Sequence, residues 1–164
     1  MAPLPIRLYP DPLLKKVAQE VAQWDSSLQC LINDMIETLY HSPGVALAAP
    51  QVGHSICLTA IDVSRSPRAG ENHGLIILIN PRIIQWEGEH RFREGCLSVP
   101  EFLTNSVRAE KVRVKALNRN GIPQEFHCEG LEAIAVQHEI DHFEGKLILD
   151  HVRSPRDLFR RKER

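Results

Sequence analysis

The feature that most constrains this chain is the segment 138–142, which reads H-E-I-D-H. Two histidines four residues apart lie about 40° apart around an α-helix, so both imidazoles can reach one metal ion. Glu139 lies at the edge of that face, where a carboxylate can move protons for a water molecule on the metal. Gly130 and Gly145 bracket the helix, and apolar residues recur at helical spacing between them. The pattern predicts a metal-binding helix on the buried side of the fold and favours metal-dependent hydrolysis.

A catalytic site needs a third ligand, and the segment 94–98, which reads E-G-C-L-S, offers one. The Cys96 thiolate binds divalent iron or zinc strongly and needs no second cysteine nearby. Together, Cys96, His138 and His142 leave the fourth tetrahedral position open for water, as in catalytic rather than structural sites. We therefore predict these three residues as the metal ligands.

Other ligands stay open at this point. Metalloproteases usually take their third ligand from downstream of the helix, where Glu144 and His151 are the candidates. Cys128 is the second candidate for the sulfur ligand. If Cys128 joined the other three ligands, it would close the site, and the chain would be a structural metal module that binds a partner. A zinc endoprotease is the competing enzyme class.

A third segment, residues 44–53, is rich in small residues that let a backbone approach a ligand closely. Within it, Gln51 is a polar side chain in an apolar stretch. Its amide N–H can donate a hydrogen bond to the oxyanion that develops during amide hydrolysis. The alternative is a tight loop whose glutamine points to solvent.

These three segments resemble, in order, the peptide deformylase motifs G-x-G-L-A-A-x-Q, E-G-C-L-S and H-E-x-D-H. The chain reads G-V-A-L-A-A-P-Q at 44–51, E-G-C-L-S at 94–98 and H-E-I-D-H at 138–142. Segments 9–14 and 108–112 are also similar to the family, and the resemblance covers about residues 6–150. It implies a metal-dependent hydrolase that removes the N-formyl group from the initiating N-formylmethionine of new polypeptides and releases formate.

The resemblance also implies a role for each site residue. The three ligands hold Fe²⁺, and Zn²⁺, Ni²⁺ or Co²⁺ can occupy the same site. Glu139 transfers the proton, while the Gln51 side chain and the Leu97 backbone N–H stabilise the oxyanion. Asp141 and Arg108 either orient the ligands or form a structural ion pair. The expected substrate-binding residues are Gly44, Val45, Ala46, Phe92, Glu94, Gly95, Leu131, Ile134 and Ala135.

Two positions depart from the family pattern. Ala46 stands where the family has the second glycine of its first motif, so its methyl group can crowd a bound peptide. Leu103 stands where many members carry an arginine beside the substrate cleft. Neither change touches a ligand or a proton-transfer group, so we expect activity with an altered peptide preference. An inactive paralogue is the alternative.

The predicted fold is a single α+β domain, with antiparallel β-sheets packed around the central metal-binding H-E-x-x-H helix and with flanking N-terminal and C-terminal helices. Residues 1–150 are the expected catalytic domain, and residues 151–164 form a basic tail that can be helical. Helices are expected at 11–18 and after Asp25, strands at 56–63, 75–79, 83–86 and 112–117, a hairpin return at 124–127, and an exposed loop at 64–74.

The chain has 164 residues, of which 43% are hydrophobic and 25% charged, as is ordinary for one globular domain. A net charge of −1 argues against DNA binding, and no apolar run is long enough to cross a membrane. The N-terminus shows no signal or transit peptide, so we expect a bacterial cytoplasmic protein. The expected partners are nascent N-formylmethionyl polypeptides, and the basic tail can contact ribosomal RNA.

Overall fold

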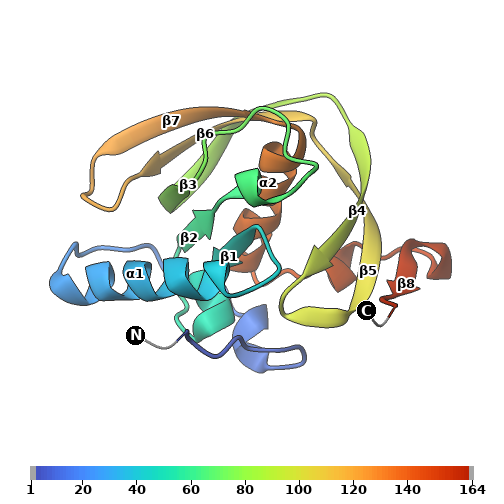
Figure 1. Ribbon diagram of the computed structural model, residues 1–164, viewed down its shortest axis with the longest axis horizontal. Coiled ribbons are helices and arrows are strands. Elements are labelled where there is room, and N and C mark those ends of the chain that lie inside the picture. The colour runs from blue at the N-terminus through green and yellow to red at the C-terminus, as the bar shows by residue number, and fades with distance from the viewer. Residues whose placement is uncertain (1–2, 163–164) are drawn as a thin grey trace.

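The computed structural model describes residues 3–162 of the chain. A five-stranded antiparallel sheet has the strand order β1-β2-β3-β6-β7, and a three-stranded sheet has the order β4-β5-β8. Helix α2 lies between the two sheets, and α1 lies on the far side of the larger one (Figure 1). The expected α+β architecture around the H-E-x-x-H helix is therefore confirmed. The elements are α1 (Ser26–Tyr40), α2 (Gly130–Phe143), β1 (Ala46–Ala48), β2 (Leu58–Ile61), β3 (Ile76–Glu87), β4 (His90–Cys96), β5 (Val99–Arg108), β6 (Lys111–Leu117), β7 (Pro123–Glu129) and β8 (Leu158–Arg160), with short 3₁₀ turns at Pro12–Lys15, Ala49–Val52, Val63–Arg65, Ile148–His151 and Pro155–Asp157.

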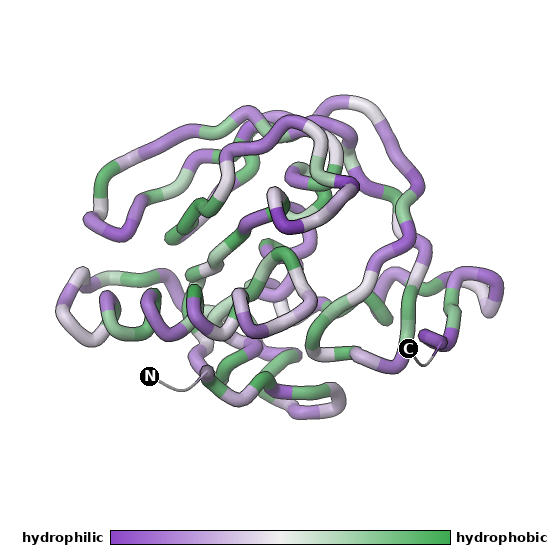
Figure 2. The backbone as a smooth tube through the Cα atoms, viewed as in Figure 1, coloured by the Kyte–Doolittle hydropathy of each residue, from purple (hydrophilic) through white to green (hydrophobic). Residues whose placement is uncertain are grey.

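The core is built on both faces of the larger sheet. Leu58 and Ala60 of β2 pack against α1, whereas Ile61 packs against α2, because alternate residues of a strand point to opposite faces. Every residue of β2 is therefore buried. Figure 2 shows the hydrophobic segments gathered in this interior, with hydrophilic residues along the outer turns. The sheet thus supplies a rigid base for α2.

Helix α1 follows the sequence prediction closely. The Asp25 side chain accepts a hydrogen bond from the Leu28 backbone N–H at 2.9 Å, so it is the N-cap that the sequence indicates. The buried positions Leu28, Ile32, Met35 and Leu39 recur at helical spacing. By contrast, the helix expected at 11–18 is only the 3₁₀ turn of residues 12–15.

One strand differs from expectation: the two strands predicted at 75–79 and 83–86 form the single strand β3. The break that the sequence suggests, around Pro81, is a bulge at which the pairing with β6 shifts between Ile79 and Arg82. Asn80 adopts a positive φ of 52°, and its side chain bonds both the N–H and the C=O of Val21. A proline that lacks an N–H fits at such a bulge without losing a ladder hydrogen bond.

The prediction of a helical tail is wrong for residues 158–160. These residues form β8, which pairs antiparallel with β5 through Phe102↔Arg160 and Thr104↔Leu158. The edge of β5 that faces away from β4 offers unpaired backbone groups, and the tail satisfies them as a strand. The final residues of the predicted tail, 163–164, lie outside the described residues. Among the described residues, no helix combines the length and apolar character that a membrane span needs.

Helix α2 begins at a glycine in the left-handed region, and a second such glycine follows its C-cap residue, Glu144. Gly130 has φ +59° and Gly145 has φ +73°. At the C-terminal end, the Gly145 N–H donates to the His142 carbonyl at 3.2 Å and the Lys146 N–H donates to the Asp141 carbonyl at 2.9 Å. This is the Schellman arrangement, which satisfies the last carbonyls of the helix that carries the histidines.

We predict that Gly145→Ala destabilises the fold more than Gly130→Ala. Both substitutions force a side chain into the left-handed region, at a cost of about 1–2 kcal/mol. A methyl group on Gly130 meets open space, whereas one on Gly145 overlaps the Lys15 backbone. Overpacking adds about 1–3 kcal/mol for Gly145 alone. Urea denaturation of both variants measures the difference in the free energy of unfolding, and equal losses would contradict the role of the Lys15 contact.

Candidate active site

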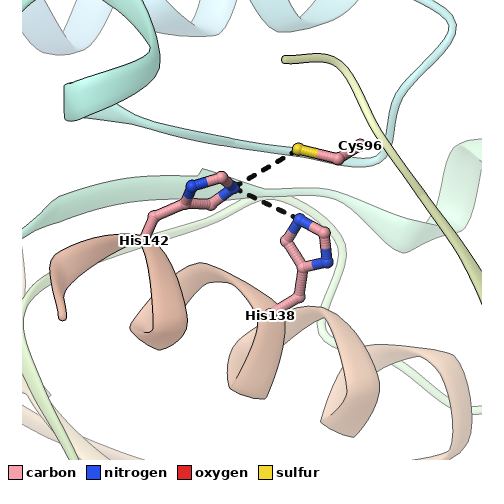
Figure 3. Close-up of side chains that lie close together, drawn as sticks. All are labelled: Cys96, His138 and His142. Atoms are coloured by element: carbon pink, nitrogen blue, oxygen red, sulfur yellow. Dashed lines mark hydrogen bonds between the residues drawn. The ribbon is translucent and has the colours of Figure 1, made fainter. Parts of the chain in front are cut away.

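Three donor atoms from two separate elements converge beside α2. The His142 Nε2 lies 3.2 Å from the His138 Nε2 and 3.6 Å from the Cys96 Sγ (Figure 3). In a tetrahedral site with bonds of 2.0–2.3 Å, neighbouring ligand atoms are separated by about 3.3–3.8 Å. The spacing of these three atoms therefore fits one divalent ion, and the three residues are those that the sequence predicts as ligands.

The histidines are prepared for metal binding by their surroundings. The His138 Nδ1 lies 2.8 Å from the Glu94 Oε1, which leaves the Nε2 of that ring free for a metal. Burial lowers the pKa of His142 well below its ordinary value, so its ring is neutral, the form that coordinates metals. Burial also opposes charge on His138, yet the adjacent Cys96 and Glu94 raise the pKa of that ring well above its ordinary value. The surroundings thus favour positive charge where the ion would bind.

Strand β4 carries both Cys96 and Glu94, the carboxylate that bonds the His138 ring. Glu94 and Cys96 are both buried at the end of β4, because residues two apart on a strand share a face. The pairing of β4 with β5 shifts between these two residues, so the strand bends where it reaches α2. The intervening Gly95 faces the cleft.

A buried ion-pair network fixes this arrangement. Arg108 on β5 donates to both Glu94 oxygens at 2.8 and 2.9 Å, and to the Asp141 carboxylate on α2 at 2.7 Å. Burial would raise the pKa of Glu94, but hydrogen bonds from His138 and Arg108 outweigh it and hold that pKa far below its usual range. Asp141 also bonds the His151 Nε2 at 2.7 Å. This network thus links the smaller sheet, through Arg108, and the turn Ile148–His151, through His151, to Asp141 on the ligand-bearing helix.

Glu139 lies on the same helix in a different environment. Its side chain is buried, and its Oε2 accepts a hydrogen bond from the Thr59 hydroxyl at 3.4 Å. Burial raises the pKa of Glu139 to about 7, against the opposing influences of His138 and Thr59. A carboxyl group with this pKa can both accept and release a proton near neutral pH. Such a pKa suits the proton-transfer role that the sequence predicts for Glu139.

The Gln51 side chain is buried and oriented by its neighbours, so the alternative of a solvent-facing glutamine is wrong. Its Oε1 accepts from the Ala48 N–H at 2.9 Å, which turns the amide Nε2 towards the Ser98 hydroxyl at 3.1 Å and the Cys96 sulfur at 3.7 Å. The Gln51 carbonyl also accepts from the Arg7 N–H at 2.6 Å. The chain's opening segment is thereby fixed to the site.

A cleft with a volume of about 1030 Å³ opens onto these residues. Its floor includes Cys96, Gln51, His138 and Glu139, with Leu97 beside them. Both departures from the family pattern, Ala46 and Leu103, also line it. Every residue expected to bind substrate lines this cleft, namely Gly44, Val45, Ala46, Phe92, Glu94, Gly95, Leu131, Ile134 and Ala135.

The alternative ligands are placed elsewhere. Glu144 pairs with Lys146 at 2.9 Å, and His151 bonds Asp141. Cys128 belongs to a separate cluster with His73 and Glu132. In that cluster, His73 Nδ1 lies 2.6 Å from Glu132 Oε1, which is a hydrogen-bond distance and shorter than two ligands of one ion allow.

The sequence analysis assigns no role to two residues that support the site. Ser98 and Thr59 contact Gln51 and Glu139, respectively. A threonine inside the apolar run at 58–61 is a polar residue in a buried strand, and that signal could have identified Thr59. His151 was considered as a ligand, but it orients Asp141 instead.

Comparison with known proteins agrees with this geometry. A sequence model of the family described as polypeptide deformylase matches residues 3–157. The peptide deformylase of Thermodesulfovibrio yellowstonii is 50% identical over 99% of this chain and 97% of its own length. That of Syntrophobacter fumaroxidans is 47% identical over 99% of this chain and 94% of its own length.

Solved structures give the same result for the fold. A crystal structure of a peptide deformylase from Legionella pneumophila superposes with a TM-score of 0.86 at 49% identity, covering 94% of this chain and 88% of that one. A peptide deformylase from Synechococcus elongatus, solved in complex with actinonin, gives a TM-score of 0.85 at 35% identity over 94% of this chain and 81% of that one. This chain therefore belongs to the polypeptide deformylase family, the hydrolases that remove the N-formyl group from newly made polypeptides.

Proposed function

We propose that this enzyme carries out deformylation at the Cys96–His138–His142 cluster with an Fe²⁺ ion. The observation that carries the proposal is the convergence of two imidazole nitrogens and one sulfur at ligand spacing, beside a buried carboxyl group and at the floor of a cleft. A divalent ion held there supplies Lewis acidity, which makes hydroxide available near neutral pH. Zn²⁺, Ni²⁺ and Co²⁺ suit the same donor set.

The residues around the metal site transfer the proton and stabilise the oxyanion. Glu139 accepts the proton of the attacking water and delivers it to the leaving amine nitrogen. The Gln51 Nε2 and the Leu97 backbone N–H donate hydrogen bonds to the developing oxyanion of the formyl group. Ala48 and Ser98 hold the Gln51 amide in the orientation that this role requires. Both donors lie at the cleft in which the peptide must bind.

The cleft also offers a binding surface for the methionine side chain of the substrate. The residues Val45, Phe92, Leu131, Ile134 and Ala135 give it an apolar wall. An unbranched, polarisable methionine side chain fits such a wall well. We therefore expect N-formylmethionyl peptides, rather than internal peptide bonds, to be the substrate, which disfavours the zinc endoprotease.

Two further predictions from the sequence concern where the enzyme acts and what its tail contacts. We expect the enzyme to act in the bacterial cytoplasm, where formylated chains are made. We also expect the tail to contact ribosomal RNA, since Arg153 and Arg156 are exposed. Co-sedimentation with ribosomes at low salt should weaken in an Arg153→Gln/Arg156→Gln variant, and unchanged co-sedimentation would refute this contact.

Replacing Glu139 tests the function and its proton-transfer residue together. The Glu139→Gln variant keeps the side-chain volume but cannot accept the proton, so we expect kcat to fall by about 10²–10⁴-fold. Formate release from a short formylmethionyl peptide, by anaerobically prepared protein, measures the effect. The metal content should stay unchanged, and Glu144→Gln, an exposed change at the end of the same helix, should keep full activity.

Either of two results would contradict the proposal. Full activity of Glu139→Gln would show that Glu139 does not transfer the proton. If the metal-loaded wild type released no formate, the inactive paralogue would be favoured. Casein cleavage without deformylation would favour the endoprotease. Metal analysis of the same preparation tests the iron assignment, which fails if the fully active enzyme contains only zinc.

The ion-pair network should support both the fold and metal binding. Arg108→Met leaves the buried Glu94 and Asp141 carboxylates without their cation, so we expect the free energy of unfolding to fall by about 3–5 kcal/mol. Because Glu94 orients His138, metal affinity should fall by about 10–100-fold. Urea denaturation and competition with a chelator measure these quantities.

The matched control is Arg113→Met, whose guanidinium pairs with Glu125 on the sheet surface with 39% of its side chain exposed. Exposed pairs contribute about 0–1 kcal/mol, so this variant should unfold nearly as the wild type does. If Arg108→Met and Arg113→Met lost equal stability, the buried network would not have the structural role that we assign to it.

A further inference from the structure

The mouth of the cleft carries a group of cations that the reaction itself does not use. We name this group the cationic rim. Of the acidic residues that line the same cleft, Glu94 and Glu139 are buried at the floor, and Glu101 is exposed. The outer part of the cleft therefore has a strong excess of positive charge. The residues of the cationic rim are Arg68, Arg93, Arg160, Arg161 and Lys162.

The charges of the cationic rim are not neutralised by the protein. Among residues 3–162, none of its five members forms an ion pair with a carboxylate, whereas surface arginines elsewhere do, such as Arg91 with Asp157 and Arg113 with Glu125. Moreover, the Arg161 Nε is buried and has no hydrogen-bond partner.

The rim is held in place rather than carried on a loose tail. The Arg93 guanidinium stacks over the Phe159 ring at 3.9 Å, and the Arg68 guanidinium stacks over Phe92 at 4.5 Å. The Arg161 N–H donates to the Glu101 carbonyl at 2.7 Å, immediately after β8 ends. Because stacking already restricts Arg68 and Arg93, these guanidinium groups lose less freedom on binding and can contribute to affinity.

The position of Arg161 connects the rim to the reacting centre. A methyl group added to Gly95 would overlap the Arg161 guanidinium, so that side chain lies directly against the residue before the Cys96 ligand. The cations and the apolar wall line the same cleft, so a peptide whose methionine occupies that wall has its following residues within reach of the rim. Its next residues therefore meet unpaired positive charge.

We propose that the cationic rim selects formylmethionyl polypeptides that carry aspartate or glutamate in the few positions after the methionine. This inference rests on the proposed function and adds a substrate class to it. Acidic side chains satisfy the guanidinium donors, whereas basic ones are repelled, and unpaired charges around a cleft raise the local concentration of oppositely charged ligands. Each exposed pair should change KM by about two- to five-fold.

The test compares three peptides that differ only in charge. Formyl-Met-Ala-Glu-Glu, formyl-Met-Ala-Ser-Ser and formyl-Met-Ala-Lys-Lys are used as C-terminal amides, so that no terminal carboxylate binds the rim. With wild-type enzyme, we expect kcat/KM to be about ten-fold higher for the acidic than for the basic peptide, with the difference in KM and not in kcat. The preference should shrink at high salt, since the Debye length falls from about 10 Å at 0.1 M to about 3 Å at 1 M.

The Arg161→Gln/Lys162→Gln variant should reduce the preference towards one, because the KM of the acidic peptide rises and that of the basic peptide falls. Arg161→Lys retains the charge and should retain the preference. The control is Arg153→Gln, an exposed change in the same tail outside the cleft lining, which should behave like the wild type.

The outcomes separate this inference from the proposed function. If the wild type deformylates all three peptides with equal KM, the rim does not select substrates, although the proposed function stands. If the double variant loses activity equally on all three, Arg161 and Lys162 only support the fold, and the inference is overturned. If no peptide is deformylated, the proposed function itself fails.

Discussion

The structure depends above all on one buried cation between two carboxylates. The Arg108 side chain is only 5% exposed, and it joins Glu94 on β4 to Asp141 on α2. Removing three charges from water is expensive, and the cost is recovered only when the geometry lets each charge find its partner. The ion pairs therefore permit one relative placement of strand and helix, and it is the placement in which Cys96 meets the two histidines.

The same ion pairs also make the pKa values of two carboxyl groups in the site, Glu94 and Glu139, differ. Glu94 has an arginine and a histidine as partners, so it stays ionised and orients His138. Glu139 is buried on α2, where burial outweighs the influence of His138, so it has a pKa of about 7 and can exchange protons. Environments that move two neighbouring pKa values apart are how one site obtains both a fixed charge and a proton carrier. Arg108 thus sets the chemistry as well as the geometry.

Much of the fold and the site could be predicted where the signal is local. Helical spacing identified α1 and α2, and the spacing within 138–142 identified the histidines. The sequence did not identify β8, because residues 158–160 become a strand only through pairing with distant β5. The sequence also did not predict the hydrogen bond from the Gln51 amide to the Ser98 hydroxyl, because a contact between segments far apart in sequence leaves no local pattern. Local periodicity therefore predicted the helices that carry the ligands, whereas the contacts that orient them required the structure.

The strand in the tail explains how a basic C-terminus can act at the cleft. A solvated tail would lose conformational entropy whenever its arginines met a ligand, and that loss would offset most of the electrostatic gain. As β8, the segment has already lost its backbone freedom through pairing with β5, and it places Arg160, with Arg161 directly after it, in the lining of the cleft. Arg153 and Arg156 precede the strand and stay exposed, so they remain available for a different anionic surface. The tail is thus divided into a part that belongs to the substrate cleft and a part that faces outward.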